Sequence, residues 1–287
     1  MTAVRQLFAV LLLAALAIPC SAAEELITIP TRNGVTLSYL LDQDKAATPK
    51  VVVISFVGSF GAIGLETRAQ KGPVKFGPTA NFLIRIRDQM TDAEIADVIV
   101  DSPSDQLPGG MSDRFRLGQD HAADIRALIT DLKRRFPGAK IFLLGTSRGT
   151  ISAAALGAGL GDVVQGVVLS STVTNADRAG TGLSAFDFGS IKVPVLLVHH
   201  RDDGCRSSPY YGAERLAKKF PLNQRQRRRS AAKRSLRGDV AARLPRARSA
   251  DRAGNPQLDA RTRVCARDPM TMLPAPVSTR LCRSRER

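Results

Sequence analysis

A serine stands between two glycines in the segment Gly145-Thr146-Ser147-Arg148-Gly149. An apolar run that suits a strand, residues 141–144, precedes this motif, and a run that suits a helix, residues 150–160, follows it. A sharp turn from strand to helix exposes the serine hydroxyl, and it needs small flanking residues because neighbouring backbones crowd the turn. The pattern therefore predicts that Ser147 is a nucleophile. The alternative is a glycine-lined turn without a catalytic role.

Two further loops follow apolar runs and carry polar groups suited to the same chemistry. Gly58-Ser59-Phe60-Gly61-Ala62 follows residues 51–57, and Asp202 and Asp203 follow the run 193–200. The first is otherwise a glycine-rich turn, and the two aspartates are otherwise solvated turn residues. A third loop, residues 101–105, either lines a pocket or is a plain polar connection.

The elements that must position these loops alternate along the chain. Asn33-Gly34 predicts a tight hairpin between two β-rich runs near the start. The apolar face recurring over residues 119–136 predicts a helix, which Pro137-Gly138 ends. Runs that suit buried strands are 51–57, 96–100, 140–144, 164–169 and 193–199. Strands alternating with helices predict an α/β fold, with a mostly parallel sheet between helical layers.

Residues 24–220 resemble the α/β-hydrolase superfamily in the Gly-x-Ser-x-Gly motif and the placement of the two other loops. The resemblance implies a serine hydrolase that cleaves a carboxylic ester or amide through an acyl-enzyme. Ser147 is then the nucleophile, and the amides of Arg148 and of Ser59, or Phe60 in its place, form the oxyanion hole. Asp203 is the expected triad acid, with Asp202 as second choice.

The histidine that should complete this arrangement is missing. A serine hydroxyl needs a neighbouring imidazole as base, and the family order is serine, acid, histidine. The chain has His121, His199 and His200, and none of them follows Asp203. His121 begins a helix, and the other two precede the acid, so we expect impaired activity. The alternative function is a non-catalytic α/β-hydrolase-like binding protein.

Residues 221–287 differ in texture from the rest of the chain. They hold 18 basic and 5 acidic residues, against 24 and 21 in residues 1–220, and they lack aromatic residues. We expect this tail to be disordered. We also expect the sheet to lack its last strand and helix, which leaves the 193–199 run as an unpaired edge. Binding of nucleic acid by the tail is disfavoured because no aromatic residue is present for stacking.

A one-base frameshift near Leu222 is our hypothesis for this texture. Reading one base further on permits a histidine across the Ala242 and Arg243 codons. It also permits a cysteine across those of Leu236 and Arg237, a disulfide partner for Cys205. An unbroken reading frame in independent clones of the gene would contradict it.

Residues 1–23 place Arg5 before an apolar run and small residues ending at Ala23. This is typical of a secretory signal and predicts a periplasmic or secreted protein without a membrane anchor after its removal. The sequence has no metal-ligand spacing and no nucleotide-binding fingerprint, so we expect no cofactor and a small-molecule ester or amide as partner.

Overall fold

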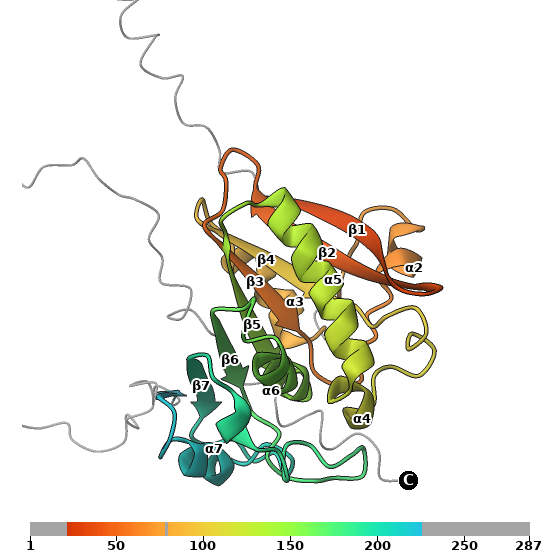
Figure 1. Ribbon diagram of the computed structural model, residues 1–287. Helices are drawn as coiled ribbons and strands as arrows, with labels where there is room; N and C mark the ends of the chain where they lie inside the picture. The colour runs from red at the N-terminus through yellow and green to blue at the C-terminus, as the bar shows by residue number, and fades with distance from the viewer. Residues whose placement is uncertain (1–21, 78–79, 226–287) are drawn as a thin grey trace, which may run out of the picture. The chain divides into compact units, whose positions relative to one another are not determined.

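The computed structural model describes residues 22–77 and 80–225 (Figure 1). These residues form one eight-stranded sheet with the order β1-β2-β4-β3-β5-β6-β7-β8. Its strands are β1 Ala22–Arg32, β2 Val35–Asp44, β3 Val51–Phe56, β4 Ile95–Val100, β5 Lys140–Thr146, β6 Gly166–Ser170, β7 Val195–His200 and β8 Leu222–Arg225. β1 and β2 form the expected hairpin, in which Gly34 has a φ of 73°. β2 also runs antiparallel to β4, and the remaining pairs are parallel, which confirms the predicted fold class.

Helices connect the parallel strands. They are α2 Leu65–Ala69, α3 Phe82–Ile86, α4 Asp113–Arg116, α5 Gln119–Arg135, α6 Gly149–Gly159 and α7 Tyr210–Leu216, with 3-10 turns at Arg87–Gln89 and Phe188–Ser190. Figure 1 shows α5 and α6 lying across the same face of the sheet. The predicted apolar face of α5, including Ile125 and Leu128, is fully buried in the main core with Val52 and Ile54 of β3. Burial of this face is what holds the helix on the sheet.

Two buried carboxyl groups lie side by side within the sheet. Asp42 of β2 and Asp97 of β4 are direct register partners, and their exposed fractions are 2% and 1%. Asp97 accepts a hydrogen bond of 2.6 Å from the Ser55 hydroxyl. Burial raises the pKa of Asp97 to about 7 and that of Asp42 to about 6. Removing a carboxylate from water favours its neutral form.

The end of the sheet differs from the sequence prediction. The expected unpaired edge at residues 193–199 is wrong, because β8 pairs in parallel with β7 from Leu197↔Leu222 to His200↔Arg225. Leu222 packs against the main core, which draws this segment onto the sheet. The folded part therefore extends beyond residue 220. Asn223, beside the hypothesised frameshift, pairs with Val198.

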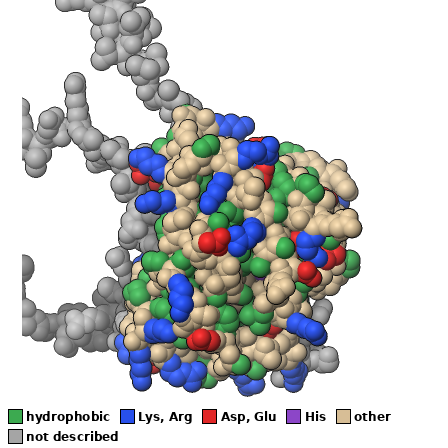
Figure 2. Space-filling view, in the orientation of Figure 1, with side chains coloured by type: hydrophobic (Ala, Val, Ile, Leu, Met, Phe, Trp, Pro, Cys, Tyr) green, Lys and Arg blue, Asp and Glu red, His purple; other side chains and the backbone are tan. Residues whose placement is uncertain are grey.

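Several expectations concern residues outside the described part. They are residues 1–21 of the signal predicted at residues 1–23, the expected disorder of the tail from residue 226 and the absence of a last helix. Within residues 22–77 and 80–225, no helix is long and apolar enough to cross a bilayer. Figure 2 shows basic and acidic side chains interspersed over most of one face of the described residues, with basic side chains more frequent along its lower edge.

Candidate active site

Ser147 lies in the turn between β5 and α6 and has a φ of 52°. A positive φ strains a residue other than glycine by about 1–3 kcal/mol, so surrounding contacts must hold it. The Ser147 amide donates to the Ser170 carbonyl of β6 at 3.0 Å. The amide and hydroxyl of Thr150 donate to the Ser147 carbonyl at 2.9 Å and 2.6 Å. The sharp strand-to-helix turn expected from the motif is therefore present, and its half-buried serine is fixed on both sides.

Both glycines of the motif are required by close backbone approach. A Cβ on Gly145 would lie 2.4 Å from the Gly149 carbonyl oxygen. A Cβ on Gly149 would lie 2.0 Å from the carbonyl oxygen of Phe56, the last residue of β3. Any side chain at either position would push the first turn of α6 away from the strands.

The loop after β3 lies directly against Ser147. A Cβ on Gly58 would be 3.0 Å from the Ser147 Cβ. Among the described residues, the backbone N–H groups of Ser59, Phe60 and Arg148 have no hydrogen-bond partner. Ser59 also has a positive φ, of 56°. Two segments thus bring unbonded amides to the surroundings of one serine, as an oxyanion hole requires.

Asn81 is a neighbour of Ser147 that the sequence analysis missed. It precedes α3, and its side-chain oxygen accepts from the Leu83 amide at 3.1 Å. Its Nδ2 atom would lie 3.2 Å from the same Cβ on Gly58, so it is within about 6 Å of the Ser147 Cβ. An asparagine before a short apolar run indicates only a helix cap. Nothing in the local sequence indicates its proximity to the serine.

The two candidate acids differ in their surroundings. Asp203 is buried, and its side chain is 1% exposed; one carboxylate oxygen accepts from the Cys205 amide at 3.0 Å. Its other oxygen lies 3.4 Å from His199 Nε2, whereas Asp202 is exposed. β6 separates β5 from β7, so the strand ends that lead to Ser147 and Asp203 are about 10 Å apart. An open pocket of about 520 Å³ lies beside Asp203, and Tyr210 and Tyr211 help to line it.

None of the three histidines, all within the described residues, is hydrogen-bonded to Ser147. His121 is 1% exposed, its ring packs edge-on against Phe56 at 5.9 Å, and burial lowers its pKa to about 3. It is therefore a neutral core residue. His199 Nε2 lies 3.0 Å from the Ser208 carbonyl, and His200 Nδ1 accepts from the Asp202 amide. None of these contacts places a histidine against the Ser147 hydroxyl.

The loop at residues 101–105 begins with a structural anchor. Asp101 is buried, and its carboxylate accepts from the amides of Ile63 and Leu65 at 2.6 Å and 2.7 Å. Burial raises the pKa of this carboxyl group. Asp101 therefore holds the segment that leads into α2. Its side chain also borders a smaller pocket of about 300 Å³, so this end of the loop lines a pocket as well.

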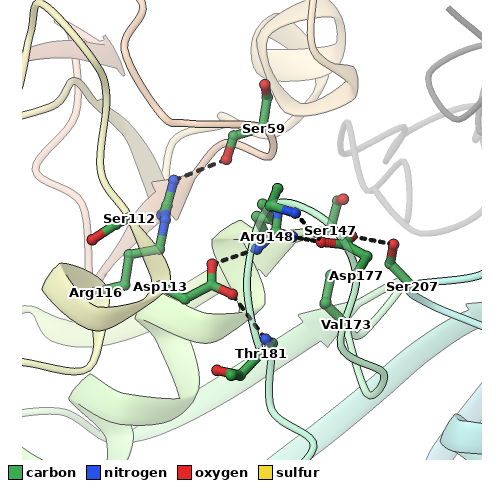
Figure 3. A network of polar contacts seen from close by, with 12 residues as sticks. Ser59, Ser112, Asp113, Arg116, Ser147, Arg148, Val173, Asp177, Thr181 and Ser207 are labelled. Carbon is green, nitrogen blue, oxygen red and sulfur yellow. Dashed lines mark hydrogen bonds and ion pairs between the residues drawn. The ribbon is translucent and has the colours of Figure 1, made fainter. Parts of the chain in front are cut away.

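A buried polar network surrounds the motif (Figure 3). The guanidinium of Arg148 pairs with Asp113 of α4 and with Asp177. Arg116, also of α4, is 1% exposed and donates to the Ser59 carbonyl at 3.2 Å and to the Ser152 hydroxyl at 2.7 Å. No local pattern in the sequence links residues 113–116 to the motif, so neither of the α4 residues could be predicted from it.

Comparison with known proteins relates the fold of the described residues to solved structures. No family model matches the chain, and no curated protein does. Est1E from Butyrivibrio proteoclasticus superposes with a TM-score of 0.50 at 13% identity, over 70% of this chain and 87% of that one. The structure of the same protein with bound ferulic acid superposes with a TM-score of 0.50 at 14% identity, over 70% of this chain and 88% of that one. An α/β serine hydrolase without lid from Xanthomonas campestris gives 0.47 at 13% identity, over 73% and 86%. At these identities the likeness to Est1E establishes a shared fold.

Proposed function

We propose, from the α/β-hydrolase fold of the described residues, that the protein is a serine hydrolase that cleaves a carboxylic ester or amide through an acyl-enzyme at Ser147. The observation that supports this most is the strained turn at Ser147, with the unbonded amides of Arg148 and Ser59 beside it. A protein maintains such strain only where the surrounding structure over-determines it, and strained residues cluster at active sites.

The reaction would use the described groups as follows. The Ser147 hydroxyl loses its proton to solvent and its oxygen attacks the acyl carbon, and the carbonyl oxygen becomes an oxyanion that accepts hydrogen bonds from the Arg148 and Ser59 amides. The bond to the alcohol or amine breaks, and this leaving group takes a proton from solvent water. A water molecule then adds to the serine ester, which releases the acid and returns a proton to Ser147. Asp203 would orient an imidazole. Without that imidazole, we expect a residual rate of about 10³ to 10⁴ over water.

The test combines covalent labelling with turnover. Wild type, Ser147→Ala and the matched control Ser184→Ala are treated with a fluorophosphonate and analysed by intact mass and peptide mapping. Ser184 is exposed and bonds only locally, to Thr181. Because the imidazole base is missing, labelling is carried out at pH 9 with excess reagent, where more of the serine hydroxyl is ionised. Under these conditions we expect one label on Ser147 in wild type and control, none in Ser147→Ala, and the same order in hydrolysis of p-nitrophenyl acetate. Equal hydrolysis by wild type and Ser147→Ala, without labelling, would refute the proposal.

A second candidate function is a non-catalytic binding protein with a hydrolase fold. It is favoured by the contacts of His121, His199 and His200, none of which includes Ser147. Under either function we propose export to the periplasm or medium and a small-molecule partner. Unlabelled Ser147 in a chain with a restored histidine downstream of Asp203 would favour the binding protein.

A further inference from the structure

We propose that two residues of α4 are positioning residues for the oxyanion hole: Asp113 holds the Arg148 segment by an ion pair, and Arg116 holds the Ser59 segment through the Ser59 carbonyl. The role rests on the proposed function, since it concerns the same site. Figure 3 shows Asp113 and Arg116 side by side on α4, directed toward Arg148 and Ser59 respectively. One short helix thus contacts both segments.

The first connection runs through Arg148. Asp113 is 5% exposed, and one carboxylate oxygen pairs with the Arg148 guanidinium. Its other oxygen accepts from the Gly182 amide at 2.8 Å. A Cβ on Gly180 would lie 2.2 Å from that oxygen, so the loop that contains Gly180 and Gly182 packs closely against the Asp113 carboxylate. The anchored side chain belongs to the residue whose own N–H has no hydrogen-bond partner among the described residues, so the anchor limits how that amide can move.

The second connection runs through Arg116. Its guanidinium bridges the Ser59 carbonyl and the Ser152 hydroxyl of α6, so it ties the loop after β3 to the helix after Ser147. A trans peptide is planar, so holding the Ser59 carbonyl also fixes the direction of the Phe60 N–H. Through the backbone of Ser59, it restrains the Ser59 N–H as well.

Electrostatics couples the two connections. The pKa of Arg116 is lowered to about 10, chiefly by burial; the charge of Asp113 acts to raise it, and the charge of Arg148 acts to lower it. Neutralising Asp113 would leave Arg148 with Asp177 alone, and it would leave the buried Arg116 without the negative charge that offsets its burial and the nearby charge of Arg148. Both arginines would then shift, and the two amide-bearing segments would shift with them.

Asp177 provides a matched comparison, because it also pairs with Arg148. Its side chain is 29% exposed, against 6% for Asp113, and it accepts a hydrogen bond from the Ser207 hydroxyl. Asp162 provides the control, because it is exposed and pairs only with Arg126 on the surface. The three variants Asp113→Asn, Asp177→Asn and Asp162→Asn make the same chemical change in three settings.

The experiment measures kcat and KM for p-nitrophenyl acetate and for its thionoester, in which sulfur replaces the carbonyl oxygen. Sulfur accepts hydrogen bonds weakly, so the oxygen-to-sulfur rate ratio reports on the oxyanion hole. We expect Asp113→Asn to lower kcat for the oxygen ester about tenfold to 100-fold and to change KM less than about threefold. The oxygen-to-sulfur rate ratio should fall by the same factor of about ten to 100. Asp177→Asn should narrow the ratio less, and Asp162→Asn should leave it unchanged.

Three outcomes would overturn this role. The first is an unchanged oxygen-to-sulfur rate ratio in Asp113→Asn, and the second is an equal loss of kcat for both esters in that variant. The third is a larger fall of the ratio in Asp177→Asn than in Asp113→Asn. Should Asp113→Asn fail to unfold cooperatively, Arg116→Lys replaces it, since lysine keeps the charge but not the planar bridge. An unchanged ratio in that variant would also overturn it. Hydrolysis that is equal in wild type and Ser147→Ala refutes the proposed function itself, which separates the two failures.

Discussion

Replacing Asp97 with asparagine should stabilise the protein at alkaline pH and have a smaller effect in acid. Asp97 is 1% exposed, and its register partner is another buried carboxyl group, Asp42. Within the described residues, one oxygen of each group has no hydrogen-bond partner. Asparagine keeps the shape and the contact with Ser55 but has no charge to bury.

The magnitude follows from the pKa of Asp97, which burial raises from 3.8 to about 7. The folded state therefore binds the proton more tightly than the unfolded state. The resulting stabilisation is fully present below pH 3.8 and is lost as the pH rises through 7. At about 1.4 kcal/mol per pKa unit, the whole effect is about 4 kcal/mol, of which between about 2 and 3 kcal/mol falls between pH 5 and pH 8.

The assay is urea unfolding of wild type, Asp97→Asn and Asp162→Asn at pH 5 and pH 8, with the free energy of unfolding extrapolated to water. The advantage of Asp97→Asn over wild type should grow by about 2 to 3 kcal/mol from pH 5 to pH 8. The pKa of Asp162 is lowered by its hydrogen bonds with Arg126, so it is ionised at both pH values and serves as the control. Parallel pH dependence of wild type and Asp97→Asn would refute the reasoning, because it would mean that Asp97 is already charged at pH 5.

Three further outcomes are expected at the site. Gly149→Ala places a Cβ 2.0 Å from the Phe56 carbonyl oxygen. It should therefore lower the free energy of unfolding, measured by urea unfolding, by about 1–3 kcal/mol. It should also abolish the labelling of Ser147, measured by mass spectrometry. Asn81→Ala should lower kcat for p-nitrophenyl acetate about tenfold if its side-chain amide helps to stabilise the oxyanion, whereas an unchanged kcat would exclude that part. The logarithm of wild-type kcat/KM should rise by about one per pH unit from pH 6 to pH 9, because only the serine alkoxide is reactive without an imidazole. A plateau of kcat/KM above pH 7 would instead reveal a histidine base.

The amino-acid sequence alone was sufficient to identify the local features of this protein. The hairpin at Gly34, the apolar face of α5 and the strand, turn and helix around Ser147 all depend on residues near one another in the chain. Backbone conformation at a glycine and the periodicity of a helix are set locally, so they can be read without knowledge of distant contacts. The order of strands and helices was in turn enough to predict the α/β class.

Tertiary structure alone decided which distant residues meet at the site. Asn81 and Arg116 reach the surroundings of Ser147 across the fold, and His121, which begins a helix, lies in the core beside Phe56. The pairing of β8 with β7 likewise depends on Leu222 finding the core. Such contacts arise from packing between segments far apart in sequence, where neither periodicity nor a short motif specifies the partner.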